Sequence, residues 1–301
     1  MTAHRHPPAK QAGQPVVAIV GVGLIGGSFA AALRASGAAG RIIGVGRQPV
    51  TLARARELGL IDQAQTLGQA MQEADVVMLA TPVGAVAGLL AAMCPSLRPG
   101  VIITDAGSTK QDIVQAARET LGDKFSQFVP GHPIAGAEQT GPEAATASLY
   151  HERTVIVTPE ADTDPEALAR VVAMWEGCGA RVMSMSAERH DRVLASVSHV
   201  PHFLSSSYMW QVAMAPDSDQ RLAVAGTGFQ DFTRIAAGSA EMWRDIFLAN
   251  RTAVLAELDE VRQAMDRLEQ ALQAADHAAI DDFLERAAVA RRFWGSRTRL
   301  P

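Results

Sequence analysis

The chain has 301 residues, of which 48% are hydrophobic and 20% charged, with a formal net charge of −5. This composition is typical of a globular protein and excludes a disordered chain, a collagen and a disulfide-rich scaffold. The acidic balance gives no overall basic field that would attract nucleic acid or an anionic membrane. The length predicts two domains. Two cysteines are too few for a disulfide framework, so we expect a reduced, cytoplasmic protein.

Two uncharged runs, residues 16–33 and 76–97, are long enough to resemble a signal-peptide core and a membrane span. Glycines interrupt the first run, and Pro82 with two glycines interrupts the second. Each run is therefore better explained as a buried strand, a turn and an apolar helix. Residues 1–14 are polar and contain two prolines, which predicts a disordered tail.

From residue 15 onward, short β-branched runs alternate with helical stretches. Strands are predicted at Val16–Val20, Arg41–Val45, Asp75–Ala80, Val101–Asp105, Gln127–Gly131, Thr154–Thr158 and Arg181–Met185. Helices are predicted at Leu24–Ser36, Val50–Leu58, Ala85–Met93, Lys110–Leu121 and Pro165–Glu176. This alternation predicts an α/β domain over residues 15–185, with a mostly parallel, doubly wound sheet.

Strand signals disappear after residue 185, and residues 186–301 predict an all-helical domain. Its helices are expected at Ala187–Val212, Ser218–Thr227, Ser239–Gln273 and Asp276–Arg292. An apolar stripe at helical spacing along residues 243–273 indicates packing against another helix. Because this helical part is near the low end of domain sizes, we expect the partner helix to come from a second subunit.

A glycine-rich loop follows the first strand and opens the first helix. Its sequence is G-x-G-x-x-G, and its residues are Gly21, Val22, Gly23, Leu24, Ile25 and Gly26. In this context the first glycine permits a tight turn, the second lets the backbone approach a pyrophosphate, and the third allows close helix–strand packing. The helix N-terminus favours the phosphates. The loop thus predicts a Rossmann-type dinucleotide site.

The end of the second strand distinguishes NAD from NADP, because an acidic residue there binds the ribose 2′-hydroxyl of NAD. The sequence at 44–48 has no acidic residue and carries Arg47, whose guanidinium suits a 2′-phosphate. We therefore favour NADP, with NAD possible. The alternative is that Arg47 is an ordinary solvated arginine and that both cofactors are accepted.

Three further segments carry polar residues that a core would not favour. Ser108 lies in the first, 104–110, and is either a ligand contact or the cap of the next helix. His132 ends a strand at the edge where α/β sheets bind ligands, and is a candidate general base. The third segment is helical and contains His199 and His202, which share a helix face. An alternative is that they form a metal site with His190 or Asp191, but no His-Glu-x-x-His motif or cysteine cluster supports it, and we expect no metal.

Together these segments resemble the prephenate and arogenate dehydrogenase family, also called cyclohexadienyl dehydrogenases, over nearly the whole chain. The motifs that carry the resemblance are Gly-Val-Gly-Leu-Ile-Gly-Gly-Ser at 21–28, Asp-Ala-Gly-Ser-Thr-Lys at 105–110 and Gly-His-Pro-Ile-Ala-Gly-Ala-Glu at 131–138. They are followed by His-Asp at 190–191, Ser-His-Val-Pro-His at 198–202 and Asp-Phe-Thr-Arg at 231–234. The glycine loop alone is common to many dehydrogenases, whereas the ordered set is specific.

The resemblance implies an oxidoreductase that uses NAD(P) for an oxidative decarboxylation in tyrosine biosynthesis. Prephenate would give 4-hydroxyphenylpyruvate, and arogenate would give tyrosine. By resemblance, His132 takes the proton of the ring hydroxyl and Ser108 orients His132 and that hydroxyl. Arg234 holds the ring carboxylate, since a guanidinium suits a planar anion. Within the same resemblance, His202 and Glu138 line the side-chain end of the pocket.

The resemblance further implies a homodimer formed through the helical domain, with Trp243 closing the pocket from the partner subunit. Because the sequence ends at Pro301, we expect neither a regulatory domain nor a fused chorismate mutase. The departure from NAD-using members at residues 46–48 is similar to NADP-using arogenate dehydrogenases.

Two other functions compete with this one. A two-domain NADP-dependent reductase of the hydroxyacid or ketopantoate type needs a catalytic lysine early in the helical domain, and residues 187–238 contain no lysine. A non-catalytic NADP-binding sensor would keep the glycine loop but has no need for Ser108, His132 and Arg234 together.

Overall fold

The computed structural model of the protein describes residues 13–137 and 139–297, without the side chains of 296 and 297. The predicted tail at 1–14 lies almost wholly outside the described residues. The chain divides into two compact units, one ending at Arg251 and the other starting at Thr252. The first unit holds all the described strands and most of the helices, and the second consists of two long helices.

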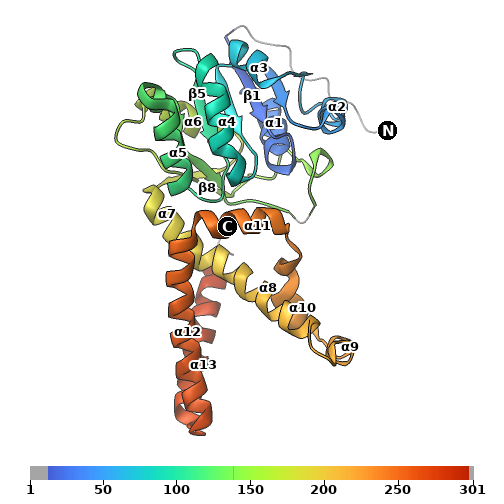
Figure 1. Ribbon diagram of the computed structural model, residues 1–301, viewed down its shortest axis with the longest axis vertical. Coiled ribbons are helices and arrows are strands. Elements are labelled where there is room, and N and C mark those ends of the chain that lie inside the picture. Colours follow the sequence, from blue (N-terminus) through green and yellow to red (C-terminus); the bar gives the residue numbers. More distant parts are fainter. Residues whose placement is uncertain (1–12, 138, 298–301) are drawn as a thin grey trace. The chain divides into compact units, whose positions relative to one another are not determined.

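The main sheet has six parallel strands in the order β3-β2-β1-β4-β5-β6 (Figure 1). The strands are β1 (Val16–Val20), β2 (Arg41–Val45), β3 (Gln63–Ala64), β4 (Val76–Leu79), β5 (Ile102–Asp105) and β6 (Phe128–Val129). The order reverses between β1 and β4, and such a switch point opens a crevice at the carboxyl ends of the strands. The predicted Rossmann-type doubly wound sheet is confirmed.

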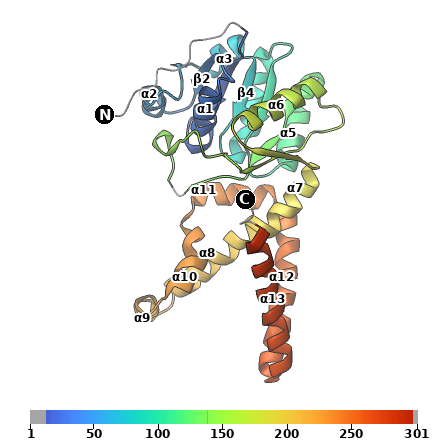
Figure 2. The ribbon, with the colours of Figure 1, turned by 180° about the vertical axis from the view of Figure 1, so that it is seen from behind.

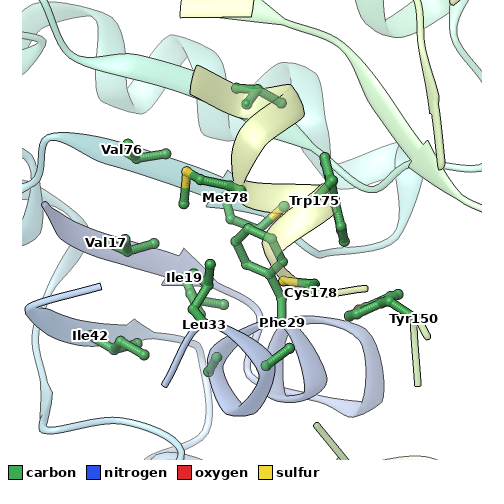
Figure 3. Packing of buried hydrophobic residues seen from close by; sticks show 14 of the residues in the cluster. Val17, Ile19, Phe29, Leu33, Ile42, Val76, Met78, Tyr150, Trp175 and Cys178 are labelled. Carbon is green, nitrogen blue, oxygen red and sulfur yellow. The ribbon is translucent and has the colours of Figure 1, made fainter. Parts of the chain in front are cut away.

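The two central strands, β1 and β4, are apolar throughout because both faces of each strand are covered. Val17 and Ile19 face one hydrophobic cluster together with helices α1 (Leu24–Ser36), α2 (Pro49–Glu57) and α6 (Pro165–Gly177). The rings of Phe29 and Trp175 pack against each other in this cluster, with centroids 4.5 Å apart. Figure 3 labels both residues among the buried side chains. Ala18 and Val20 face a second cluster on the other side of the sheet. That cluster is built by α3 (Leu67–Glu73), α4 (Val86–Met93) and α5 (Gln111–Leu121).

A second, three-stranded sheet lies outside the parallel one. Its strands are β7 (Gly131–Pro133), β8 (Thr154–Val157) and β9 (Arg181–Ser184), with β7 antiparallel to β8 and β9 parallel to it. The predicted single strand 127–131 is therefore wrong, because it splits between the two sheets at Pro130. Proline has no N–H to donate to a strand ladder. The chain leaves the parallel sheet at this residue, and β7 pairs with β8 instead.

The sequence did not predict β3 and α3. The strand β3 has only two residues, too few for a periodic pattern. The helix α3 begins with a capping box, in which the Thr66 side chain accepts a hydrogen bond from the Gln69 backbone N–H and the Gln69 side-chain oxygen accepts one from the Thr66 backbone N–H. The spacing of threonine and glutamine was the available signal for this helix start.

After Ser184 every described element is helical. The first unit continues with α7 (Ala187–Leu194), α8 (Val200–Ala213), α9 (Ser218–Ala223), α10 (Thr227–Thr233) and α11 (Ala240–Ala249), which Figure 2 shows from behind. Ala187 and Ile246 from this region are buried in the second hydrophobic cluster of the sheet. The two compact units therefore divide at residue 251, later than the domain boundary predicted near residue 185. Compact units are not the same as domains, so the predicted boundary stays a prediction.

The predicted continuous helix 187–212 is interrupted by a π-helical turn at Ala195–His199. Pro201 follows this turn as the second residue of α8. A proline ring clashes with the carbonyl four residues earlier and lacks an N–H, so a regular α-helix is not favoured here. The wider π turn carries the chain past the proline and sets the orientation of His199.

The second unit contains α12 (Arg251–Gln273), which starts at the last residue of the first unit, and α13 (His277–Arg297). The predicted helix 239–273 is thus two helices, separated at Asn250. Over the described part of the chain, no helix is long and apolar enough to cross a membrane.

Two glycines of the glycine-rich motif, the N-cap Gly23 and Gly26 within α1, should respond differently to mutation. A Cβ at Gly26 would lie 2.1 Å from the carbonyl oxygen of Gly21 and 2.8 Å from Ile19, whereas a Cβ at Gly23 meets no atom within 4 Å. We expect Gly26→Ala to lower the free energy of unfolding by about 1–3 kcal/mol through overpacking. Gly23→Ala should cost under about 1 kcal/mol. Urea denaturation tests this, and equal losses for both variants would contradict it.

Candidate active site

The glycine loop lies at the carboxyl end of β1, at the switch point of the sheet. Gly21 has φ +96°, which only glycine adopts readily, and its N–H donates to the carbonyl of Val45 at 2.9 Å. Gly23 precedes α1 and faces open space, so a ligand can approach its backbone. Leu24 and Ile25 form the first turn of α1, where N–H groups lack acceptors within the helix. These features fit a bound dinucleotide pyrophosphate.

Tyr150 fixes the position of this first turn. Its hydroxyl donates a 2.6 Å hydrogen bond to the Ile25 carbonyl, and the ring is fully buried. Burial raises the pKa of the Tyr150 hydroxyl, so it remains a donor. Tyr150 is not predictable from the sequence as a contact of the glycine loop, because a buried tyrosine far along the chain carries no local motif.

Arg47 lies two residues beyond the end of β2, and its side chain is exposed. An exposed guanidinium at this strand end is free to reach a ligand bound along the loop at the sheet edge. The neighbouring residues Gly46 and Gln48 are uncharged.

Asp105 and Lys110 form a buried ion pair at the end of β5. Both side chains have no solvent exposure. The Asp105 carboxylate also accepts hydrogen bonds from the N–H groups of Gly107 at 2.8 Å and Gly131 at 3.0 Å. The Lys110 ammonium donates to the Gly131 carbonyl at 2.8 Å. This pair ties the start of β7 to the end of β5 and so fixes the backbone beside His132.

His132 contacts a second histidine through its Nδ1 atom. That atom lies 2.8 Å from Nε2 of His190, and the Nδ1 atom of His190 lies 2.8 Å from the Asp191 carboxylate. His190 and Asp191 are fully buried, whereas His132 is half-buried. The expected orienting partner of His132 was Ser108, but His190 contacts its ring.

Asp191 also caps helix α5. Its two carboxylate oxygens accept the backbone N–H groups of Lys110 at 2.8 Å and Gln111 at 2.9 Å. The alternative that Ser108 caps this helix is therefore wrong, because α5 begins at Gln111 and Asp191 supplies the acceptor from a distant segment. Burial alone would raise the pKa of Asp191, but the hydrogen bonds from His190 and from these backbone groups hold it below its usual value.

All four histidines of this region have lowered pKa values. Burial is the largest cause of the low pKa of His132; protonation of His190 or His199 would lower it further, and so does the positive charge of Lys110. Burial likewise lowers the pKa of His190, against the opposing effect of Asp191. These histidines are therefore neutral at pH 7, and a neutral imidazole can accept a proton.

His199 is held by Asn250, a residue that the sequence did not predict as part of the site. The Asn250 side-chain amide donates to the Asp191 carbonyl at 2.7 Å and lies 3.1 Å from Nδ1 of His199. The backbone of Ser108 faces the same ring. Burial lowers the pKa of His199 to about 4. A buried asparagine at a helix junction gives no recognisable sequence signal.

His202 and Trp243 stack on each other, with ring centroids 3.5 Å apart and an interplanar angle of 25°. His202 is half-buried, and its low pKa results from burial and from the positive charge of Arg234 nearby. The structure therefore brings His202, Trp243 and Arg234 together. Trp243 packs on its own chain here, so its expected role across a dimer stays a prediction.

Two further predictions concern Glu138 and a bound metal ion. Glu138 lies outside the described residues. The residues that the structure describes contain no group of three or more histidines, cysteines or acidic residues arranged to hold a metal ion.

Two family models match the chain in succession. The model described as prephenate dehydrogenase, nucleotide-binding domain, matches residues 29–184, and the model described as prephenate dehydrogenase, dimerization domain, matches residues 186–286. The chain is also similar to a cyclohexadienyl dehydrogenase from Zymomonas mobilis, with 36% identity over 86% of this chain and 89% of that protein.

Two solved structures are similar over nearly the whole chain. One is a prephenate dehydrogenase from A. aeolicus in complex with hydroxyphenyl propionate and NAD+, with a TM-score of 0.88 and 35% identity. The similarity covers 94% of this chain and 99% of that one. The other is an arogenate dehydrogenase from Synechocystis, with a TM-score of 0.79 and 30% identity, covering 93% and 99%.

The buried histidines predict that stability depends on pH. At pH values between 6.5 and about 4, the unfolded chain protonates residue 199 while the folded chain does not. The free energy of unfolding should therefore be highest above pH 6.5 and fall as the pH drops toward 4, by up to about 3 kcal/mol for this residue. His199→Asn should flatten the dependence in urea denaturation, whereas His277→Asn, at an exposed histidine, should not. Identical slopes for His199→Asn and wild type would contradict this.

Proposed function

Because the chain belongs to the prephenate dehydrogenase family, an oxidoreductase family, we propose that it catalyses the NAD(P)-dependent oxidative decarboxylation of prephenate or arogenate. The observation that carries the proposal is the position of His132. It lies in the middle of β7, whose first residue is fixed to the carboxyl end of β5 by the Asp105–Lys110 pair. The glycine loop lies at the carboxyl end of the neighbouring parallel strands. A neutral histidine in this position is suited to act as a general base.

The chemistry explains why one base suffices. When bound, a nicotinamide ring accepts the hydride from the ring carbon that bears the hydroxyl. His132 takes the hydroxyl proton as the carbonyl forms. Loss of CO2 then sends its electron pair into the ring, which becomes aromatic, and the oxygen recovers the proton from His132. No proton is released overall, so His132 is neutral again at the end of each turnover.

The substrate's two ends need different partners. We assign Arg234 to the ring carboxylate, which a guanidinium can bind in a bidentate manner. His202 and Glu138 are assigned to the side-chain end, with Trp243 against His202. Ser108, whose backbone faces His199, is assigned to the hydroxyl region beside His132.

Gly21, Gly23, Leu24, Ile25 and Gly26 are assigned to the cofactor pyrophosphate. The conformation of Gly21 and the open space at Gly23 support this assignment. NADP is the favoured cofactor, since Arg47 is exposed at the end of β2 without a neighbouring acidic residue.

The chain is further proposed to form a homodimer through its helical part. The match of residues 186–286 to a dimerization domain supports this. On α12 the large apolar side chains of Leu255, Met265 and Leu272 are more than half exposed, which is unfavourable for a lone helix pair. A cytoplasmic location is proposed because Cys94 and Cys178 are both free.

The direct test is to assay prephenate and arogenate, each with NAD and with NADP, by following reduced nicotinamide. We expect turnover of at least one substrate and a lower KM for NADP than for NAD. Arg47→Ala should raise the KM for NADP and leave the KM for NAD nearly unchanged. An absence of turnover in all four combinations would contradict the proposed activity.

Variants at the two ends of the site should separate chemistry from binding. His132→Asn should lower kcat by ~10²–10⁴-fold, the range for a lost general base, with the Kd of the cofactor unchanged. Arg234→Gln should act mainly on the KM of the substrate. Unchanged turnover in His132→Asn, or an unchanged KM in Arg234→Gln, would reject the corresponding role.

A further inference from the structure

His190 and Asp191 have no part in the proposed function so far, although both are fully buried beside its base. Their protons can be assigned from the hydrogen bonds. The Asp191 carboxylate accepts two backbone N–H groups and is held ionised, so it can only accept. The Nδ1 atom of His190, 2.8 Å from this carboxylate, must therefore carry a proton.

The next contact follows from the first. His190 is neutral and carries its proton on Nδ1, so its Nε2 atom has a lone pair and accepts. The atom that faces it at 2.8 Å is Nδ1 of His132, which must then be the donor. With its proton on Nδ1, a neutral His132 has an unprotonated Nε2. That is the atom a general base needs.

We propose that His190 and Asp191 are positioning residues that hold His132 in the Nδ1-protonated tautomer, with Nε2 free to take the substrate's hydroxyl proton. This inference rests on the proposed function of His132. A buried carboxylate that selects the tautomer of a catalytic histidine is a known device, although here a second histidine lies between the two.

The charges around the contacts from His132 to His190 to Asp191 favour a role for His190 in positioning His132 over a role in carrying protons. Lys110 and Asp105 form an ion pair beside it, and His199 lies on its other side, joined to Asp191 through Asn250. Burial and the Lys110 charge both disfavour a second proton on His190. Because the reaction returns the proton to the substrate oxygen, His190 has no need to conduct it away.

Two amide substitutions at His190 separate positioning from packing. A glutamine places its amide near the Nε2 position and can accept from His132, but it loses the Nδ1 donor to Asp191. An asparagine places its amide near the Nδ1 position and can still donate to Asp191, but it does not reach His132. Arg192→Gln, on the exposed side of α7, is the matched control.

We expect His190→Asn to lower kcat by ~10²–10⁴-fold with little change in the substrate KM, since the base loses its fixed tautomer. His190→Gln should retain kcat within about tenfold of wild type, and Arg192→Gln should match wild type. A purely structural role for His190 predicts the opposite order, because asparagine keeps the buried Asp191 partnered. Thermal unfolding of each variant shows whether loss of activity follows loss of the fold.

The outcomes distinguish this inference from the proposed function. If His132→Asn is inactive while His190→Asn keeps wild-type kcat, or if His190→Gln is the more impaired variant, the positioning role is wrong and the function stands. If His132→Asn itself turns over normally, the assigned base is wrong. A higher kcat for His190→Gln than for His190→Asn, at equal stability and KM, supports the positioning role.

Discussion

The arrangement of the active site depends on one buried carboxylate. Asp191 accepts hydrogen bonds from His190 and from the first backbone groups of α5. A buried charge is tolerated only when it is paired or hydrogen-bonded. The hydrogen bonds stabilise the buried carboxylate, and the carboxylate in turn gives these N–H groups their acceptor. Through this residue the first helical segment after the sheets is joined to the loop that follows β5, and the orientation of His132 follows.

The second constraint is the ion pair of Asp105 and Lys110, which fixes the start of β7 against the end of β5. It places His132 next to the carboxyl end of the parallel sheet. The glycine turn at the end of β1 lies on the same edge, because parallel strands end on the same side. The candidate site therefore depends both on the parallel sheet and on α7, whose Asp191 binds the start of α5.

The sequence predicted those elements of the fold that a continuous local pattern of apolar residues marks. The largely apolar strands β1, β2, β4 and β5 agree with prediction because each is a short continuous apolar run, and the helix α1 agrees because the glycine-rich turn marks its start. The split at Pro130 and the π turn before Pro201 were not predicted, although proline sterics explain both. A strand pattern does not reveal which sheet receives the strand.

The sequence indicated which residues belong to the candidate site, but it did not predict which of them contact one another. His132 was identified from its strand end and rigid surroundings, and the His-Asp pair at 190–191 was noted without a role. That Asp191 caps α5 could not be foreseen, since its partners lie about 80 residues away in the chain. Tyr150 acts through one side-chain hydrogen bond and Asn250 through two, and neither leaves a pattern in the sequence.

The central claim is that His132 presents an unprotonated Nε2 to the substrate. The most direct measurement is the ¹⁵N NMR spectrum of histidine-labelled protein at neutral pH, with His132→Asn used to assign the signals, because ring-nitrogen shifts distinguish the two tautomers. The account predicts a protonated Nδ1 and a bare Nε2 for His132, and the same pattern for His190. A proton on Nε2 of His132 in the folded protein would contradict it.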